Sequence, residues 1–263
     1  MKYRYEELTW PEIRDAVKEE KVLVLPVGTV EQHGHHLPLS VDNLTSGELS
    51  RRAVESIPEE ALLMPQVSYG FNEHHLDFPG TIAIQHENFI GYMVDIGQSI
   101  AHHGFRKLIM VNGHGSNIPF LEIACRRINN TTDANAAILP WWNLAKPAIA
   151  EIRESPKPGG MSHGGELETS VILHLRPDLV QMEKASVDIN YQKSDFIWWD
   201  LEEGSPVRFM EHFSRLSKTG AIGDPTLGTE EKGKKVAEYT VDRLVALIKE
   251  FRRREIPPRV DHH

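Results

Sequence analysis

Two short apolar runs, residues 22–27 (VLVLPV) and 107–112 (KLIMVN), are each followed by a glycine. Continuous runs of aliphatic and β-branched residues predict strands that are buried on both faces. Between them, residues 87–103 carry apolar side chains three or four positions apart, the pattern of an amphipathic helix. Strands that alternate with helices of ten or more residues predict an α/β fold, with a mostly parallel sheet covered on both faces.

The rest of the chain continues this alternation. Further strands are expected at residues 62–67, 81–84 and 136–140, and further helices at residues 9–20, 43–56, 118–128, 166–175 and 229–254. Residues 183–226 show no clear periodicity, and loops of this length usually form lids, binding loops or subunit contacts. No repeat or linker divides the chain, so we expect one domain over residues 1–263.

Composition narrows the possible functions. The net charge of -9 argues against a nucleic-acid-binding surface. No apolar run approaches the ~20 residues that span a bilayer, and the first residues lack the apolar core of a signal peptide. Cys125 is the only cysteine, so no intrachain disulfide can form. These observations predict a soluble, cytoplasmic enzyme that binds neither nucleic acid nor membrane.

The densest group of polar side chains follows the first buried strand. Glu31 and His33 would point to the same side of an extended loop, because side chains alternate there with a period of two. Asp42 follows a few residues later, and its carboxylate can offer one oxygen to each of two metal ions. Carboxylate and imidazole ligands without cysteine suit Zn, Mn, Fe or Mg. A solvated surface turn is the alternative, and His35 and His36 could be packed or lie outside the ligand set.

Two later segments carry similar groups. His114 lies between two glycines after the second buried strand, where positive φ allows a sharp turn. The alternative there is a plain strand-to-helix turn capped by Asn117. His163 precedes two glycines and could act as a general acid or base near neutral pH. The helix dipole alone explains Glu166 at a helix start, but it does not require Glu168 as a second acid.

Both histidine-bearing loops, residues 28–42 and 112–117, leave the carboxyl ends of predicted strands. Ligands bind beyond these ends in parallel sheets, which favours a site that the two loops share. Residues 69–81 are rich in the same polar groups and could line a pocket. Trp141 and Trp142, which follow another predicted strand, could pack in the core or form a wall of that pocket.

In their order along the chain, these segments resemble the creatininase family, the creatinine amidohydrolases and their relatives. The matching segments are 25–28 (LPVG), 31–34 (EQHG), 37–39 (LPL) with Asp42, 78–81 (FPGT), 112–117 (NGHGSN), 163–170 (HGGELETS) and 223–225 (GDP). The resemblance covers about residues 20–230. It implies a three-layer α/β/α sandwich with a mostly parallel central sheet, assembled into homohexamers.

The resemblance also implies a binuclear site of two divalent ions (Zn, Mn or Fe) that opens cyclic amides and related C–N bonds. Glu31, Asp42 and His114 would hold one ion. His33 and Asp42 would hold the second ion, with Glu168 as the extra carboxylate. Glu168 could instead orient the nucleophile, and the sequence does not separate these two roles.

Two features of the resemblance bear on the reaction. His163 matches a histidine that contacts the substrate and passes a proton to the leaving nitrogen. Creatininase proper has a Tyr-Glu pair where this chain has Gly115 and Ser116, which removes a ligand carboxylate that Glu168 could replace. This departure argues against creatinine as the substrate and is closer to the pattern of formamide-hydrolysing relatives.

We therefore expect a metal-dependent amidohydrolase that cleaves the C–N bond of a small cyclic amide or formamide by means of metal-activated hydroxide. One alternative is ring opening of a cyclic diketone, as in inosose hydrolases, on the same binuclear site. Another is a metal-binding protein of the same fold without turnover. A mononuclear lyase or isomerase with His163 as its base is a third.

Overall fold

The computed structural model describes all of residues 1–263. Four parallel strands form the central sheet in the order β2–β1–β3–β4. These strands are β1 (Val22–Val27), β2 (Ala61–Leu63), β3 (Lys107–Asn112) and β4 (Asn135–Pro140). The register pairs Val27 at the end of β1 with Asn112 at the end of β3. The carboxyl ends of these two strands therefore lie side by side.

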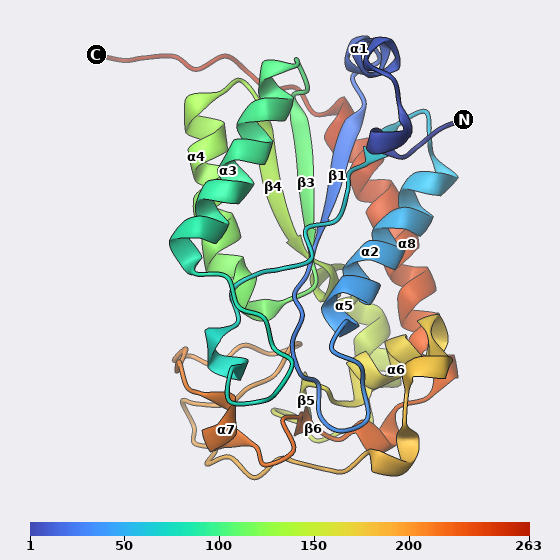
Figure 1. The fold of residues 1–263 in the computed structure, drawn as a ribbon, viewed down its shortest axis with the longest axis vertical. Coiled ribbons are helices and arrows are strands. Elements are labelled where there is room, and N and C mark those ends of the chain that lie inside the picture. Colours follow the sequence, from blue (N-terminus) through green and yellow to red (C-terminus); the bar gives the residue numbers. More distant parts are fainter.

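Helices cover both faces of this sheet. The chain forms the helices α1 (Trp10–Lys18), α2 (Val41–Ser56), α3 (His86–His102), α4 (Ile118–Thr131), α5 (Trp141–Ile152), α6 (Glu166–Leu175), α7 (Phe213–Leu216) and α8 (Glu230–Arg253). Helices α3 and α4 pack on one face, and α2, α5 and α8 pack on the other (Figure 1). This arrangement is the expected three-layer α/β/α sandwich.

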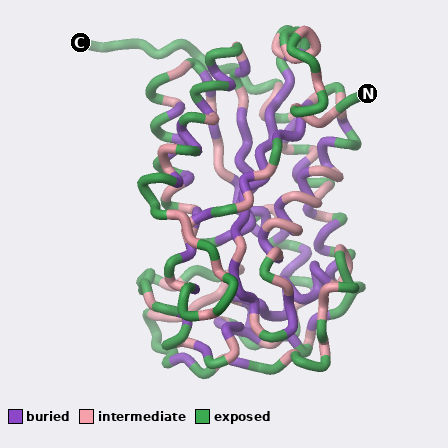
Figure 2. Tube along the Cα trace, viewed as in Figure 1, coloured by how far each residue is buried: buried purple, intermediate pink, exposed green.

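Alternating side chains along β1 serve two separate cores. Val22 and Val24 pack toward α2, α5 and α8, whereas Leu23 and Leu25 pack toward α3 and α4. Each of the four side chains is at most 1% exposed, and burial of one such side chain stabilises the fold by about 1.5–3 kcal/mol. The run is apolar throughout because both of its faces are covered, as the purple strands in Figure 2 show.

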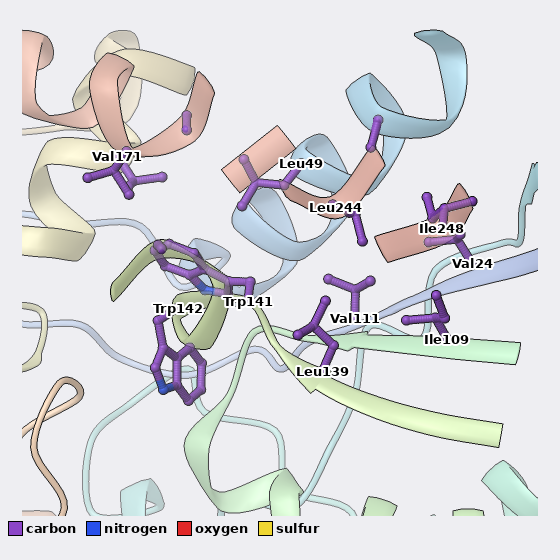
Figure 3. Packing of buried hydrophobic residues seen from close by; sticks show 14 of the residues in the cluster. Val24, Leu49, Ile109, Val111, Leu139, Trp141, Trp142, Val171, Leu244 and Ile248 are labelled. Carbon is purple, nitrogen blue, oxygen red and sulfur yellow. The ribbon is translucent and has the colours of Figure 1, made fainter. Parts of the chain in front are cut away.

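The core on the α2–α5–α8 side closes near the carboxyl end of β4. Figure 3 shows Val111 and Leu139 on the strands, Leu244 on the facing helix, and Trp141 and Trp142 just beyond β4. Both tryptophans are buried in this cluster. The core on this side therefore extends to the carboxyl ends of β3 and β4.

A smaller layer lies beyond the carboxyl ends of the central strands (Figure 1). It contains the antiparallel pair β5 (Met161–His163) and β6 (Ile222–Gly223), the short helix α7, and much of residues 183–226. A bridge from Asp188 to Gly223 ties the irregular segment to β6. None of the helices combines the length and apolarity needed to cross a membrane.

Several expected elements differ from those observed. The expected strand at residues 81–84 is wrong, because Ile82 makes only a single bridge to Val30 and is 47% exposed. The expected strand at residues 62–67 is shorter and ends at Leu63. Helix α5 and strand β5 were not predicted. Pro147 inside α5 interrupts the usual helical pattern, since proline lacks the backbone donor that a helix interior uses.

Candidate metal centre

Four polar side chains meet where β1 and β3 end. Glu31 and His33 lie on the loop after β1, His114 lies directly beyond β3, and Asp42 is the second residue of α2. Each is at most 5% exposed. The parallel pairing of β1 with β3 brings the two loops together, as expected for sites beyond the carboxyl ends of strands.

Glu31, Asp42 and His114 form one group of candidate ligands, with their donor atoms within 4.8 Å of one another. His114 Nδ1 lies 3.1 Å from Glu31 Oε1 and 3.3 Å from Asp42 Oδ2. The other ring nitrogen, Nε2, lies 3.0 Å from the carbonyl oxygen of Phe71 and donates its hydrogen there. In neutral His114, Nδ1 therefore presents its lone pair to the two carboxylates. An N–H bonded to a backbone carbonyl is also typical of metal-binding histidines.

His33, Asp42 and Glu168 form a second group, whose ligand atoms also lie within 4.8 Å of one another. His33 Nε2 lies 3.2 Å from Asp42 Oδ1 and 3.9 Å from Glu168 Oε1. Glu168 reaches the group from the first turn of α6, and its other oxygen accepts a 2.6 Å hydrogen bond from the amide of Gly164. The two oxygens of Asp42 thus face different groups.

Donor chemistry and burial both fit divalent cations here. Both carboxylate oxygens of Glu31 and the Nε2 atom of His33 are buried and have no hydrogen-bond partner within the protein. A buried carboxylate without partners is costly, so such atoms usually coordinate a cation or pair with one. Oxygen and imidazole donors without thiolate suit Zn, Mn or Fe.

The charges of this cluster shift its pKa values strongly. Burial lowers the pKa of His33, but the charges of Asp42 and Glu168 outweigh it and raise that pKa to about 9. At His114, burial again lowers the pKa, but the charges of Glu31 and Asp42 outweigh it and raise the pKa to about 10. Burial raises the pKa of Glu168 to about 7. The buried excess of negative charge therefore attracts positive charge, whether protons or metal ions.

His163, at the end of β5, stacks on His33 with ring centroids 4.1 Å apart. Its Nε2 atom lies 2.6 Å from the carbonyl oxygen of Gln32, and its Nδ1 atom lies 3.8 Å from Glu31 Oε1. Burial and the neighbouring His33 lower the pKa of His163 well below the usual value, so the ring is neutral. His163 also forms a third possible ligand group with Glu31 and His33.

Other polar residues near the cluster have structural explanations. Glu166 points away from it and accepts hydrogen bonds from the amides of Glu154 and Ser155 and from Lys232 Nζ. His35 is exposed, whereas His36 is buried and bonds Thr169 Oγ1. Neither histidine belongs to a ligand group.

In the alternative interpretation of the loop after β3, Asn117 caps a plain turn, and Asn117 does hold the N-cap position of α4. It makes no side-chain cap, and its amide instead bonds the backbone of Phe71 and Gly28. It therefore joins the loop after β3 to two neighbouring loops.

The sequence did not single out His75 or Gln32. His75 Nε2 lies 3.5 Å from Glu31 Oε1, and its Nδ1 atom lies 2.9 Å from Gln32 Nε2. Residues 69–81 were expected to line a pocket, and His74 and His75 do so. The dense polar composition of that segment was the only signal for them.

The cluster opens into a cavity of about 680 Å³. Asp42, His114, His163 and Glu168 lie on its polar side. Aromatic side chains form much of the remaining wall, namely Phe71, Phe120, Trp142, Trp198, Trp199, Phe209 and Phe213. Trp142 thus belongs to both the core and the cavity wall, whereas Trp141 packs only in the core.

A family model described as creatininase (creatinine amidohydrolase) matches residues 6–248. The chain belongs to the creatininase family. A creatinine amidohydrolase from Pseudomonas putida is 31% identical over 96% of both chains. A mycofactocin precursor peptide peptidase from Mycobacterium tuberculosis is 32% identical, covering 86% of this chain and 84% of the relative. A 3-dehydro-scyllo-inosose hydrolase from Thermotoga maritima is 26% identical over 97% of this chain and 86% of the relative.

Solved structures of creatininases also superpose closely. A creatininase described as the Mn form has a TM-score of 0.80 at 30% identity, covering 95% of this chain and 99% of the other. A Zn–Zn creatininase variant gives the same TM-score at 29% identity and the same coverage. The protein is therefore a hydrolytic enzyme of the creatininase family, which confirms the resemblance found in the sequence.

Proposed function

We propose that this creatininase-family enzyme uses two divalent metal ions to hydrolyse the C–N bond of a small cyclic amide or formamide. The observation that carries the proposal is Asp42, whose Oδ1 and Oδ2 atoms face two separate ligand groups at the base of the cavity. A shared carboxylate of this kind is typical of two-metal hydrolytic sites.

The ligand assignment follows these contacts. Glu31, Asp42 and His114 would hold one ion, and His33, Asp42 and Glu168 the other. The bound ions would supply an activated water and polarise the scissile carbonyl.

The chain's own side chains would control the proton and exclude solvent. His163 donates its Nε2 hydrogen to the carbonyl of Gln32, which leaves the Nδ1 lone pair free to take a proton from the attacking water and then pass it to the leaving nitrogen. Stacking on His33 fixes the plane of the His163 ring. The Gly164 amide holds one oxygen of Glu168, so its other oxygen is directed at the cluster. The aromatic wall keeps bulk water away from these groups.

The size and lining of the cavity bear on the substrate. Gly115 and Ser116 occupy the place of the Tyr-Glu pair of creatininase proper, and Ser116 Oγ bonds His74 Nε2 at 2.9 Å. Small side chains here leave room for a group other than the creatinine ring. At about 680 Å³ the cavity could also hold a longer ligand, since pockets of ~300–1,000 Å³ take drug-sized molecules.

A peptide amide bond is the second candidate. The cavity volume favours it, and the mycobacterial relative with 32% identity acts on a peptide precursor by its name. The Thermotoga relative supports ring opening of a cyclic diketone less strongly, at 26% identity.

A hydrolysis screen tests these candidates directly. The metal-loaded protein is incubated with cyclic amides, N-formyl compounds, short peptides and cyclic diketones, and new amine or carboxylate is measured. We expect turnover of a cyclic amide or a formamide. Turnover of peptides alone would support the second candidate, and turnover of diketones alone would exclude amide hydrolysis. Two bound ions without turnover of any compound would indicate a metal-binding protein.

A further inference from the structure

The side-chain amide of Gln32 has a fixed orientation. Its oxygen accepts a 2.9 Å hydrogen bond from the backbone amide of Gly34, and its nitrogen donates a 2.9 Å hydrogen bond to the carbonyl of Gly220. A backbone N–H can only donate and a carbonyl can only accept. The two contacts therefore exclude a flipped amide, an ambiguity that distances alone often leave open. Gly220, with φ +92°, allows this close approach, since a Cβ there would clash with Gln32 Oε1.

This orientation decides which nitrogen of His75 carries the proton. The second hydrogen of Gln32 Nε2 points to His75 Nδ1, 2.9 Å away, so Nδ1 must be the acceptor. Neutral His75 then carries its hydrogen on Nε2. That atom is buried, has no other partner and lies 3.5 Å from Glu31 Oε1. At 3.5 Å, with no hydrogen bond formed, the contact between this N–H and the Glu31 carboxylate is electrostatic.

We propose that Gln32 and His75 are positioning residues that orient Glu31 for the metal ion held with Asp42 and His114. The proposal rests on the metal centre proposed above and adds two residues that act on it. His75 lies near enough to resemble a ligand, but an N–H cannot coordinate a cation. A partner that orients a ligand typically changes metal affinity by about 10–100-fold when it is removed.

Gln32 also determines which ring nitrogen of His163 carries the hydrogen. Both hydrogens of its amide are used by Gly220 and His75, so the 3.3 Å contact with His163 Nε2 is not a third donation. His163 Nε2 instead donates to the backbone carbonyl of Gln32 at 2.6 Å. One residue thereby fixes the proton positions of two histidine rings beside Glu31.

Simple packing is the competing explanation for His75. Its ring lies against Phe213, with centroids 3.9 Å apart, and against His74. Packing would hold the ring in place but would not select one nitrogen for the proton. The position of the proton therefore separates the two explanations.

The first experiment measures that proton with two-bond ¹H–¹⁵N spectra of the uniformly ¹⁵N-labelled chain prepared without metal. Ring signals are assigned from His75→Phe and His163→Phe variants. We expect both rings to carry hydrogen on Nε2, and Gln32→Glu to move the His75 hydrogen to Nδ1, because a carboxylate can only accept. Gln192→Glu adds the same charge at an exposed position and should leave both rings unchanged. Hydrogen on Nδ1 of His75 in the wild-type chain would overturn the proposal.

The second experiment measures Zn²⁺ affinity against a competing chelator. His75→Phe keeps an aromatic ring at this position but removes the Nε2–H donor. We expect about 10–100-fold weaker binding of one ion while the other binds normally. His75→Gln keeps an N–H donor and should recover most of that loss. Unchanged affinity for both ions in His75→Phe would contradict the positioning role. If the wild-type chain binds no Zn²⁺ at all, the proposed metal centre fails, whereas the spectra still test the Gln32–His75 contact.

Discussion

Glu166 and Glu168 lie two residues apart on the first turn of α6, yet their carboxylates contact different parts of the protein. Glu166 faces the backbone of Glu154 and Ser155 and the Lys232 ammonium, all on the side away from the metal centre. Glu168 faces His33. The helix turns about 100° per residue, so positions i and i+2 point to nearly opposite sides.

This contrast gives a matched pair of variants. Glu168→Gln should weaken one metal site selectively, because its amide nitrogen would face His33 in place of an oxygen ligand. Glu166→Gln should keep both ions but lower the free energy of unfolding by about 2 kcal/mol through its weakened contact with Lys232. Metal content per chain and denaturant unfolding measure the two effects. Loss of metal from Glu166→Gln, or full metal content in Glu168→Gln, would contradict the assignment.

A variant of His163 tests the proposed role of this residue in proton transfer. His163→Ala should keep both ions and lower turnover by roughly 10²–10⁴-fold, because the leaving nitrogen loses its proton donor. A substrate whose leaving group needs no proton should be affected much less. Wild-type turnover in the variant would make His163 structural. Loss of an ion would instead make it a ligand, the role that its grouping with Glu31 and His33 allows.

The sequence predicted single residues best where backbone geometry brings them together. Glu31 and His114 could be placed in one site because each follows a buried strand and parallel strands end at the same edge. Gln32 and His75 could not, because their contact joins loops 43 residues apart and depends on side-chain orientation. Periodicity carries no information about such contacts.

At the level of elements, strands buried on both faces were the most predictable. The bounds of β1 and β3 match the expected runs, because a continuous apolar stretch has few alternatives inside a sheet. Residues 81–84 have similar composition, but Ile82 makes only an isolated bridge to Val30 and the Ile84 amide bonds the Gly70 carbonyl, so no strand forms. A run of apolar residues becomes a strand only where a neighbouring strand pairs with it, and the sequence pattern does not show which segments become neighbours.

The irregular segment over residues 183–226 is held by Asp188 more than by regular structure. Its Oδ2 atom accepts hydrogen bonds from Ser217 Oγ at 2.8 Å and from the amides of Lys218 and Thr219 at 3.0 and 3.2 Å. Gly220, which contacts Gln32, follows directly. Asp188 therefore holds the turn that leads into Gly220, whose carbonyl accepts the hydrogen bond from Gln32.

Asp188 predicts a pH dependence of stability. Burial raises the pKa of its carboxyl, but the hydrogen bonds from Ser217 and Thr219 outweigh this, and the pKa is lowered overall. A lowered folded-state pKa stabilises the fold above the unfolded value of about 3.9. That contribution is lost as the pH falls through the lower folded-state value. Asp188→Asn should therefore lower the free energy of unfolding by about 1–3 kcal/mol at neutral pH, and the difference from wild type should shrink below about pH 4.

Urea unfolding at a series of pH values measures this difference. Asp195→Asn, on an exposed residue of the same segment, is the control and should show little change at any pH. A difference that stays constant from neutral to acid pH would show that the charge of Asp188 does not stabilise the loop.

On the scale of the whole molecule, two chain regions complete one cavity. The sandwich supplies the proposed ligands from the loops after β1 and β3 and from α2 and α6, together with part of the aromatic wall. The smaller layer supplies His163 and the rest of the wall, which comes from residues 198–213. The division follows from the fold, because strand ends fix the ligands while irregular loops are free to shape the cavity. The relatives differ in the substrates that their names give, although each is similar to this chain over most of its length. Assembly into homohexamers and a cytoplasmic location stay predictions from the sequence.

Metal binding should stabilise the whole fold, since the ligands come from segments that meet only when the chain is folded. An ion present at 100 times its Kd adds about 2.7 kcal/mol, which corresponds to a rise in Tm of roughly 5–10 °C for a chain of this size. Asp42→Ala removes the carboxylate shared by both groups, so this variant should bind neither ion and show no rise in Tm with Zn²⁺. Asp133→Ala, an exposed acid, should behave like wild type.

Thermal scans with and without chelator, together with elemental analysis, separate the possible results for Asp42→Ala. Two ions per chain in the variant would refute a bridging Asp42. One ion per chain would mean either that Asp42 serves only one of two independent groups or that Glu31, His33 and His163 hold an ion without it. We expect neither ion, with a cooperative transition near that of the chelated wild type. Without Asp42 the two proposed sites keep only two ligands each, Glu31 with His114 and His33 with Glu168, since His163 is assigned to proton transfer and not to a metal. Structural zinc sites use four ligands and catalytic sites three, so two side chains are too few to retain either ion.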